Sequence, residues 1–277
     1  MKSSRSARLL HGLLLAALGL TFLLPLVWMV ATSLQPEGKA LGRGLFEFPD
    51  GPQWGNYPLA VEQMGSFGRQ FFNTALLTVL SIAGQLFCCS LAGYAFARLR
   101  FRGRDGLFLL VLATMMLPPQ VLAIPQFLLF RQLGLIDTFA PLLLPTVLGG
   151  APFFIFLFRQ YFLSLPRELD EAARMDGCGF FGTYWRVALP LAGPVVGSVA
   201  IFTFLATWND FWAPLIYLNS EENQTLTLAL ASFQQSYRLA VEWLMAGTSL
   251  VLAPCVLVYF VFQRVFVRGV RLSAAKG

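Results

Sequence analysis

Long apolar stretches alternate with short charged ones along the whole chain. An ionised residue in the middle of a bilayer costs about 2.5 to 3.5 kcal/mol on insertion scales, so the gaps between charges mark candidate membrane spans. Each long gap holds about 20 residues or more, which at about 1.5 Å per residue crosses a hydrocarbon core of about 30 Å. The gaps are Leu13 to Thr32, Arg69 to Arg98, Asp105 to Arg131, Asp137 to Arg159, Arg186 to Asp210 and Glu242 to Arg264. The pattern predicts six transmembrane helices.

Composition supports the same class. Of the 277 residues, 57% are hydrophobic and 12% are charged, and the mean hydropathy is +0.66. This leaves too little polar surface to cover a soluble globule. We therefore predict an all-α integral membrane protein. Neither a low-complexity tract nor a convincing internal repeat interrupts the pattern, so we expect a single membrane domain over residues 1–277, with a core at about 70–264.

The first apolar stretch has an alternative interpretation as a secretory signal peptide. Lys2, Arg5 and Arg8 precede it, and Ala31 and Ser33 are small residues of the kind found at cleavage sites. However, the apolar run is longer than the roughly 7 to 15 residues of a cleaved signal. An uncleaved first span is therefore favoured.

Lysine and arginine predict the orientation, because cytoplasmic connections carry an excess of both. One side of the predicted topology holds Lys2, Arg5, Arg8, Arg98, Arg100, Arg102, Arg104, Arg159, Arg167, Arg174, Arg186, Arg264, Arg268, Arg271 and Lys276. The other side holds Lys39, Arg43, Arg69, Arg131 and Arg238. Both termini are therefore predicted in the cytoplasm. The basic pI of about 9.4 reflects this topology and contact with anionic lipid, and nucleic acid is not expected as a partner.

Residues suited to catalysis are scarce. Cys88, Cys89, Cys178 and Cys255 have neither metal-ligand spacing nor an obvious disulfide pattern, and His11 lies at the edge of the first span. None of the three lysines completes the GxxxxGK[ST] loop that cradles phosphates. We expect no metal, no cofactor and no ATPase site in this chain. A membrane enzyme would need clustered catalytic groups, and a self-contained carrier or channel would need its own ion relay.

A short acidic segment lies between the fourth and fifth predicted spans. Pro166 suits the first position of a helix, and Gly177 can adopt the left-handed conformation that ends one. The predicted helix, Pro166 to Asp176, is roughly 16 Å long, too short to cross a membrane.

Helical periodicity gives this helix two faces. Leu169, Ala172 and Ala173 share one face, and the other holds Arg167, Asp170, Glu171 and Arg174. The helix could lie on lipid, or Glu171 could pair with Arg167. Interfacial helices usually carry basic rather than acidic residues, and two alanines would anchor weakly. Docking of the small and acidic residues onto a basic partner protein is favoured.

The sequence of this segment resembles a known motif. It reads EAARMDG, then nine residues, then VALP, with fixed positions at Glu171, Ala172, Ala173, Gly177 and the pair Leu189–Pro190. This matches the EAA loop of permease subunits of bacterial ATP-binding cassette (ABC) importers. Val187 stands where isoleucine is commoner, which is a mild departure.

Further stretches extend the resemblance. AGYAFARLRFRGRD (Ala92 to Asp105), TWNDFWAPL (Thr207 to Leu215) and the final AKG (Ala275 to Gly277) resemble the smaller six-span permease of the sugar-importer branch, of the maltose and glycerol-phosphate type. The tail RLSAAKG departs from the family's usual glycine-rich ending, so no role is assigned to it.

The resemblance implies the type I ABC importer transmembrane fold and a role in uptake of a sugar, oligosaccharide or sugar-like compound at the bacterial inner membrane. It implies that the coupling segment, residues 164–190, docks on an ATPase subunit, with Glu171 as acidic anchor, Ala172 and Ala173 allowing close approach, and Gly177 turning the chain. Leu189 and Pro190 would begin the return to the membrane. The implied partners are a second permease, two ATP-binding subunits that hold ATP and Mg, and an extracytoplasmic solute-binding protein.

Prolines interrupt the third predicted span. Pro118, Pro119 and Pro125 remove backbone donors there, and the freed carbonyls could line a pathway or the prolines could simply bend the helix.

Three polar residues are candidates for a substrate pathway. Asn209 and Asp210, between two tryptophans, could form a polar gate, although an interface-anchored helix end explains them better. Gln85 could line the pathway or make an interhelical hydrogen bond.

Overall fold

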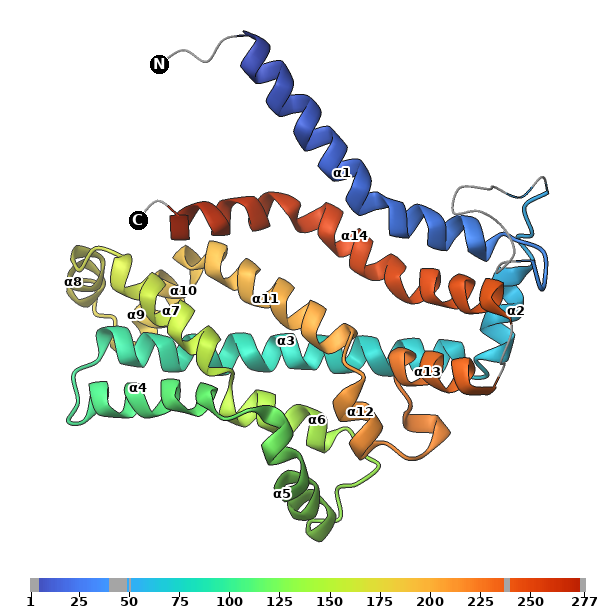
Figure 1. The fold of residues 1–277 in the computed structure, drawn as a ribbon. Coiled ribbons are helices and arrows are strands. Elements are labelled where there is room, and N and C mark those ends of the chain that lie inside the picture. The colour runs from blue at the N-terminus through green and yellow to red at the C-terminus, as the bar shows by residue number, and fades with distance from the viewer. Residues whose placement is uncertain (1–4, 40–48, 50, 237–239, 275–277) are drawn as a thin grey trace. The chain divides into compact units, whose positions relative to one another are not determined.

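The computed structural model of the protein describes residues 5–39, 49, 51–236 and 240–274, and every regular element in these ranges is a helix (Figure 1). Four of the residues used to predict the orientation, Lys2, Arg43, Arg238 and Lys276, lie outside the described residues, as does the final Ala275 to Gly277. The all-helical class predicted from the sequence is confirmed for the described part of the chain.

The helices belong to two compact units, Met1–Phe67 with Ala229–Pro254, and Gly68–Leu228 with Cys255–Gly277. The first unit contains α1 (Arg5–Ser33), α2 (Asn56–Gln63), most of α13 (Leu226–Ser236) and the beginning of α14 (Val241–Ala274). The second contains nearly all of α3 (Phe67–Arg98), then α4 (Arg104–Ala113), η1 (Thr114–Met116), α5 (Pro119–Gln132), α6 (Ala140–Leu144), η2 (Pro145–Gly149), α7 (Pro152–Ser164), α8 (Glu168–Met175), α9 (Phe180–Thr183), η3 (Tyr184–Ala188), α10 (Leu189–Leu191), α11 (Gly193–Trp208), α12 (Trp212–Tyr217) and η4 (Glu221–Asn223).

Buried polar groups fix the first unit. The side-chain amide of Asn56, at the start of α2, donates to the carbonyls of Ser33 and Gln35, both at 2.8 Å. Glu242 of α14 is fully buried and accepts a hydrogen bond from the backbone N–H of Gly38. The end of α1 is thereby held against α2 and α14.

Four of the predicted spans are present as single helical stretches, His11–Ser33, Phe67–Arg98, Ala140–Ser164 and Val241–Gln263. Two more are broken, Arg104–Met116 with Pro119–Gln132, and Phe180–Leu191 with Gly193–Trp208. The described residues therefore give six spans when each bent pair counts as one. This agrees with the number predicted from the gaps between charges.

Of the two breaks, one was predicted from the sequence and the other was not. The third span bends by 97° between Met116 and Pro119, where the prolines predicted an interruption. The fifth bends by 77° at Ala192, a break that we did not predict. Its cause is local, because Gly193 and Pro194 follow one another there and this dipeptide favours a turn.

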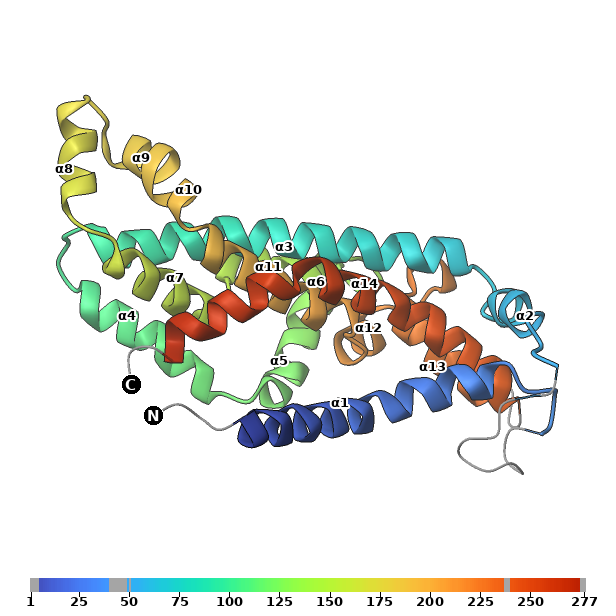
Figure 2. The same cartoon turned by 90° about the horizontal axis from the view of Figure 1, so that it is seen from above.

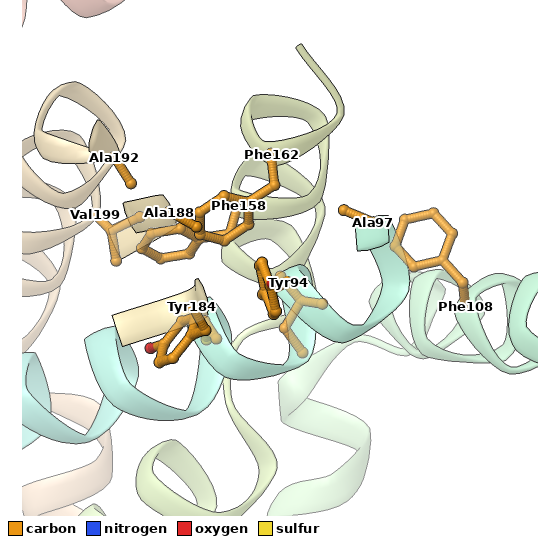
Figure 3. Packing of buried hydrophobic residues seen from close by; sticks show 11 residues of the cluster. Tyr94, Ala97, Phe108, Phe158, Phe162, Tyr184, Ala188, Ala192 and Val199 are labelled. Atoms are coloured by element: carbon orange, nitrogen blue, oxygen red, sulfur yellow. The ribbon is translucent and has the colours of Figure 1, made fainter. Parts of the chain in front are cut away.

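The centre of the second unit is an aromatic cluster where α3, α7 and η3 meet (Figure 3). The ring of Tyr94 lies 5.5 Å from that of Phe162 and 5.2 Å from that of Tyr184. The Tyr184 hydroxyl is 2.7 Å from Ser90 Oγ, so this buried phenol is hydrogen-bonded. Within a membrane such close packing, rather than exclusion of water, holds helices together. The cluster therefore fixes the segment that follows α8 onto α3.

Candidate functional site

The short acidic helix predicted from the sequence is α8, Glu168–Met175. In Figures 1 and 2 it lies beyond the end of α3 that adjoins α4. Glu168, Asp170 and Glu171 fall in its first turn, where negative charge is stabilised by the helix dipole. Pro166 was predicted to be the first helical residue, and that prediction is wrong by two positions. Pro166 lies outside the helix and Arg167 is the N-cap.

The end of α8 confirms the predicted glycine stop. Gly177 has φ of 78°. Its N–H donates to the Arg174 carbonyl at 3.0 Å, and the N–H of Cys178 donates to the Ala173 carbonyl at 2.9 Å. This pair of bonds is the Schellman motif, which needs a left-handed residue that glycine adopts without strain. The chain consequently reverses sharply after α8.

A buried arginine from α3 holds α8 in place. Arg98 forms an ion pair of 3.0 Å with Asp170, and its Nη2 donates to the Leu165 carbonyl at 2.8 Å. The side chain of Arg98 is only 8% exposed and that of Asp170 is 22% exposed. Ala173, on the same side of the helix, is buried. The start and the inner face of α8 are thus fixed to the end of α3.

The division of α8 into two faces was predicted only partly correctly. Ala173 is buried and Leu169 is half-buried, as expected for the apolar face. Ala172 was assigned to that face but is exposed. Asp170 was assigned to the charged outer face but turns towards α3, because Arg98 pairs with it. The exposed residues of α8 are Glu168, Glu171, Ala172, Arg174 and Met175, and Met175 is 86% exposed.

The segment after α8 carries the remaining motif residues back to the body of the unit. Leu189 packs against the aromatic cluster, and Pro190 is exposed in the short α10. Tyr184 anchors the segment through its hydrogen bond to Ser90. The motif therefore forms a helix, a turn and a second helical segment, in which Glu171 and Ala172 are exposed and Leu189 packs against the core.

The polar pathway candidates do not come together in one site. Gln85 is buried, and its Oε1 accepts the N–H of Ala151 at 2.9 Å, at the start of α7. Of the two roles expected for Gln85, a pathway contact or an interhelical hydrogen bond, the structure shows the hydrogen bond. Asn209 ends α11 and donates to the Leu205 carbonyl at 2.9 Å. The Asp210 carboxylate accepts the N–H of Ala213 at 3.3 Å, at the start of α12.

Asp210 does line a cavity. The cavity has a volume of about 180 Å³ and lies within the second unit. Its other lining residues are Thr74, Leu77, Ser81, Leu142, Thr146, Ala206, Thr207, Pro214 and Thr225. The lining combines hydroxyl groups and one carboxylate with apolar side chains, and neither Gln85 nor Asn209 is among the lining residues.

At the other end of α3, Asp137 organises the loop of residues 218–225. Its Oδ1 accepts the N–H groups of Asn219 and Ser220, both at 2.9 Å, and the Ser220 hydroxyl at 3.0 Å. These donors, that of the Ser220 backbone first, hold the pKa of Asp137 below its ordinary value of 3.8. Asn73 of α3 donates to the carbonyl of Glu222 in the same loop at 2.9 Å. This loop and α8 therefore lie at opposite ends of α3, as the predicted topology requires.

Two functional roles were not evident from the sequence. Arg98 holds Leu165 and Asp170, and Asp137 holds Asn219 and Ser220, all of them distant along the chain, so no local pattern in the sequence indicates these contacts. Among the described residues, no group of three or more histidine, cysteine or acidic side chains is placed to hold a metal ion. All four cysteines are free.

Comparison with known proteins places this chain among transport permeases. Residues 89–272 match the family model described as the binding-protein-dependent transport system inner membrane component. The arabinooligosaccharides transport system permease protein AraQ of Bacillus subtilis is 35% identical over 262 residues, which cover 94% of this chain and 92% of AraQ. The diacetylchitobiose uptake system permease protein DasC of Streptomyces coelicolor is 30% identical over the whole of both chains. A chain in the crystal structure of a bacterial ABC transporter involved in the import of the acidic polysaccharide alginate superposes with a TM-score of 0.79 at 27% identity, covering 95% of this chain and 99% of that chain.

Proposed function

This chain belongs to the family of inner membrane components of binding-protein-dependent transport systems, and we propose that it carries a carbohydrate and receives the energy for transport through α8. It is a multi-pass permease subunit of an ABC importer. Beyond this role, we propose a substrate class, a set of partners and a function for α8.

The exposed surface of α8 supports the coupling role. Glu171, Ala172 and Met175 are exposed, and the acidic and small side chains suit close docking onto a basic cleft. The opposite face is held by the Arg98–Asp170 pair, and the Schellman turn fixes its end. A rigid element of this kind transmits a displacement instead of absorbing it. The exposed acidic helix, held at its start by Arg98 and at its end by the Schellman turn, is the observation that carries the proposal.

The mechanism follows from that rigidity. When two partner ATPase subunits close on ATP, they move the docked α8. Because Tyr184 and Leu189 pack the following segment against α3, the movement reaches the spans. The spans then exchange between inward-facing and outward-facing arrangements, which is alternating access.

The proposed complex contains several subunits besides this chain. A second permease forms the pathway together with this chain, two ATP-binding subunits dock from the cytoplasm, and a solute-binding protein delivers substrate from outside. ATP and Mg bind to the ATPase subunits, and this chain holds no cofactor. The complex lies in the bacterial inner membrane.

The substrate class rests on relatives. Two of them are named for arabinooligosaccharides and diacetylchitobiose, and the structural neighbour takes part in alginate import. We expect a sugar, an oligosaccharide or a sugar-like compound. Thermal-shift screening of the companion solute-binding protein against sugars and glycerol phosphates tests this, and stabilisation by amino acids or peptides alone would contradict it.

Charge reversal on α8 tests the coupling role. Glu171→Lys is expected to leave membrane insertion intact and to abolish substrate-stimulated ATP hydrolysis in the assembled complex. Glu221→Lys makes the same charge change on an exposed residue at the other end of α3 and is expected to leave stimulation unchanged. Full stimulation in the Glu171→Lys complex would refute the role of α8.

A further inference from the structure

Two adjoining cavities at the base of α8 have several arginines in their linings. One, of about 500 Å³, lies along the turn between α3 and α4, and the other, of about 340 Å³, reaches from that turn to α8. Both volumes fall within the roughly 300 to 1,000 Å³ of small-ligand sites. Arg100, Arg104 and Arg167 line both cavities. The two cavities thus form one basic recess in the second unit.

The positive charge of this recess is only partly neutralised within the chain. Arg98 pairs with Asp170, and Arg104 pairs with Asp105, each at 3.0 Å. The buried Nε of Arg98 has no hydrogen-bond partner among the described residues. Arg174 and Glu171 complete the charged lining of the second cavity.

Two arginines of the recess remain available for a ligand. Arg100 and Arg167 are exposed and make no ion pair or side-chain hydrogen bond with another described residue. At Gly103 and Gly106 an added Cβ would meet nothing within 4 Å, so this wall is open. Two guanidinium groups that line the same open recess favour a phosphate, which guanidinium groups bind through several hydrogen bonds.

The surroundings point to a phosphate carried by a lipid. The recess lies where Phe67–Arg98 ends and where Arg104–Met116 begins, at the ends of candidate spans. Exposed apolar side chains line it, with Phe101 42% and Phe180 60% exposed. A soluble anion gains nothing from such neighbours, whereas a phospholipid places its acyl chains beside them. Basic recesses at the cytoplasmic ends of spans are suited to anionic headgroups.

We propose that this recess binds the headgroup of an anionic phospholipid, which bridges the turn between α3 and α4 to the base of α8. Arg100 comes from the turn and Arg167 directly precedes α8, so one phosphate bound by both ties the two elements together. The lipid would then strengthen the attachment that Arg98 already makes to Asp170. The effect of the lipid on coupling rests on the proposed function, but the binding of the lipid to the recess does not.

Lipid retention by the purified full chain tests the proposal. The chain is reconstituted in nanodiscs of phosphatidylcholine with a minor fraction of phosphatidylglycerol, released into mild detergent and measured by native mass spectrometry. The wild type is expected to retain phosphatidylglycerol. Each arginine removed should weaken retention about fivefold, the effect of one basic residue near a membrane surface, so Arg100→Gln with Arg167→Gln should nearly abolish it.

Two control variants separate charge from position. Arg100→Lys with Arg167→Lys keeps the charge and should retain most of the lipid. Arg69→Gln with Arg131→Gln removes the same charge from exposed residues predicted to lie on the external side, and it should retain lipid like the wild type. Equal retention by the Arg100→Gln, Arg167→Gln chain and the wild type would overturn the proposal.

The other possible occupants give different results. Inorganic phosphate that binds in pure phosphatidylcholine with the same arginine dependence, and displaces phosphatidylglycerol, would identify a soluble-anion site and overturn the lipid proposal. Loss of ATPase-subunit co-purification in the glutamine variant with lipid retention unchanged would identify a protein contact and overturn it equally. Because retention needs no transport, its failure is distinguishable from a failure of the proposed function, which the Glu171→Lys complex reports.

Discussion

Arg98, the last residue of α3, and Asp170, in the first turn of α8, form a nearly buried ion pair of 3.0 Å. The same guanidinium donates to the Leu165 carbonyl, just before α8. One side chain thus fixes both the start and the inner face of the helix proposed to dock on the ATPase.

Removal of the Asp170 charge should loosen α8. Asp170→Asn leaves Arg98 buried without its counter-ion, at a cost of roughly 1 to 3 kcal/mol, below the range for fully buried pairs because Asp170 retains some exposure. We expect faster hydrogen exchange in α8 and weaker substrate-stimulated ATP hydrolysis, with normal insertion. The exchanged pair, Arg98→Asp with Asp170→Arg, should recover part of both. Unchanged exchange in Asp170→Asn would contradict the anchoring role.

Close approach of α3 and α7 should depend on Gly93. A Cβ there would lie 2.5 Å from Phe158 Cβ and 3.0 Å from the Arg159 backbone nitrogen, and the backbone cannot move aside cheaply. Gly93→Ala should lower the free energy of unfolding by about 1 to 3 kcal/mol, the usual cost of overpacking. Gly106→Ala in α4 meets nothing within 4 Å and should stabilise its helix by up to about 1 kcal/mol. Thermal unfolding of the detergent-solubilised variants measures both, and equal stabilities would show that the contact is not tight.

The loop of residues 218–225 should open in acid. Because donors from this loop lower the pKa of Asp137, its charge stabilises the folded loop above the unfolded pKa of about 4, and this contribution is lost as pH falls through the lower folded pKa. Limited proteolysis should therefore accelerate in strong acid. Asp137→Asn tolerates the positive φ but should make the loop more easily cleaved at neutral pH and less sensitive to pH.

A matched control is needed for that experiment, because Glu222 in the same loop is also acidic and pairs with Arg69 at 3.1 Å. Both of these side chains are well exposed, so their pair contributes little. Glu222→Gln should keep the acid sensitivity of the wild type. If Glu222→Gln removes the sensitivity and Asp137→Asn does not, Asp137 is not the group responsible.

The sequence predicted the membrane spans well because a charged residue in the middle of a bilayer is costly. Charged residues are therefore absent from the middle of the spans, and the uncharged stretches mark their positions. The sequence also located α8 and its end, since Gly177 has few alternatives to the left-handed turn. The break at Pro118 and Pro119 was visible for a similar reason. Local chemistry decided each of these features.

Features set by distant residues were not predictable in this way. The rotation of α8, which exposes Ala172 and buries Ala173, is decided by Arg98 from another helix. The helical pattern alone placed Asp170 on the outer face, and no local signal corrects that. The bend at Ala192 is different, because the dipeptide Gly193–Pro194 is itself a local signal for a turn.

The most direct measurement is photo-crosslinking from the end of α8 in the assembled complex. A benzophenone amino acid at Met175, whose side chain is 86% exposed, is compared with one at Trp54, which is 65% exposed before α2 in the predicted external connection. Docking of α8 on the cytoplasmic ATPase predicts a permease–ATPase product from position 175 and none from position 54. A product with the solute-binding protein from position 175, or an ATPase product from position 54 alone, would contradict the account.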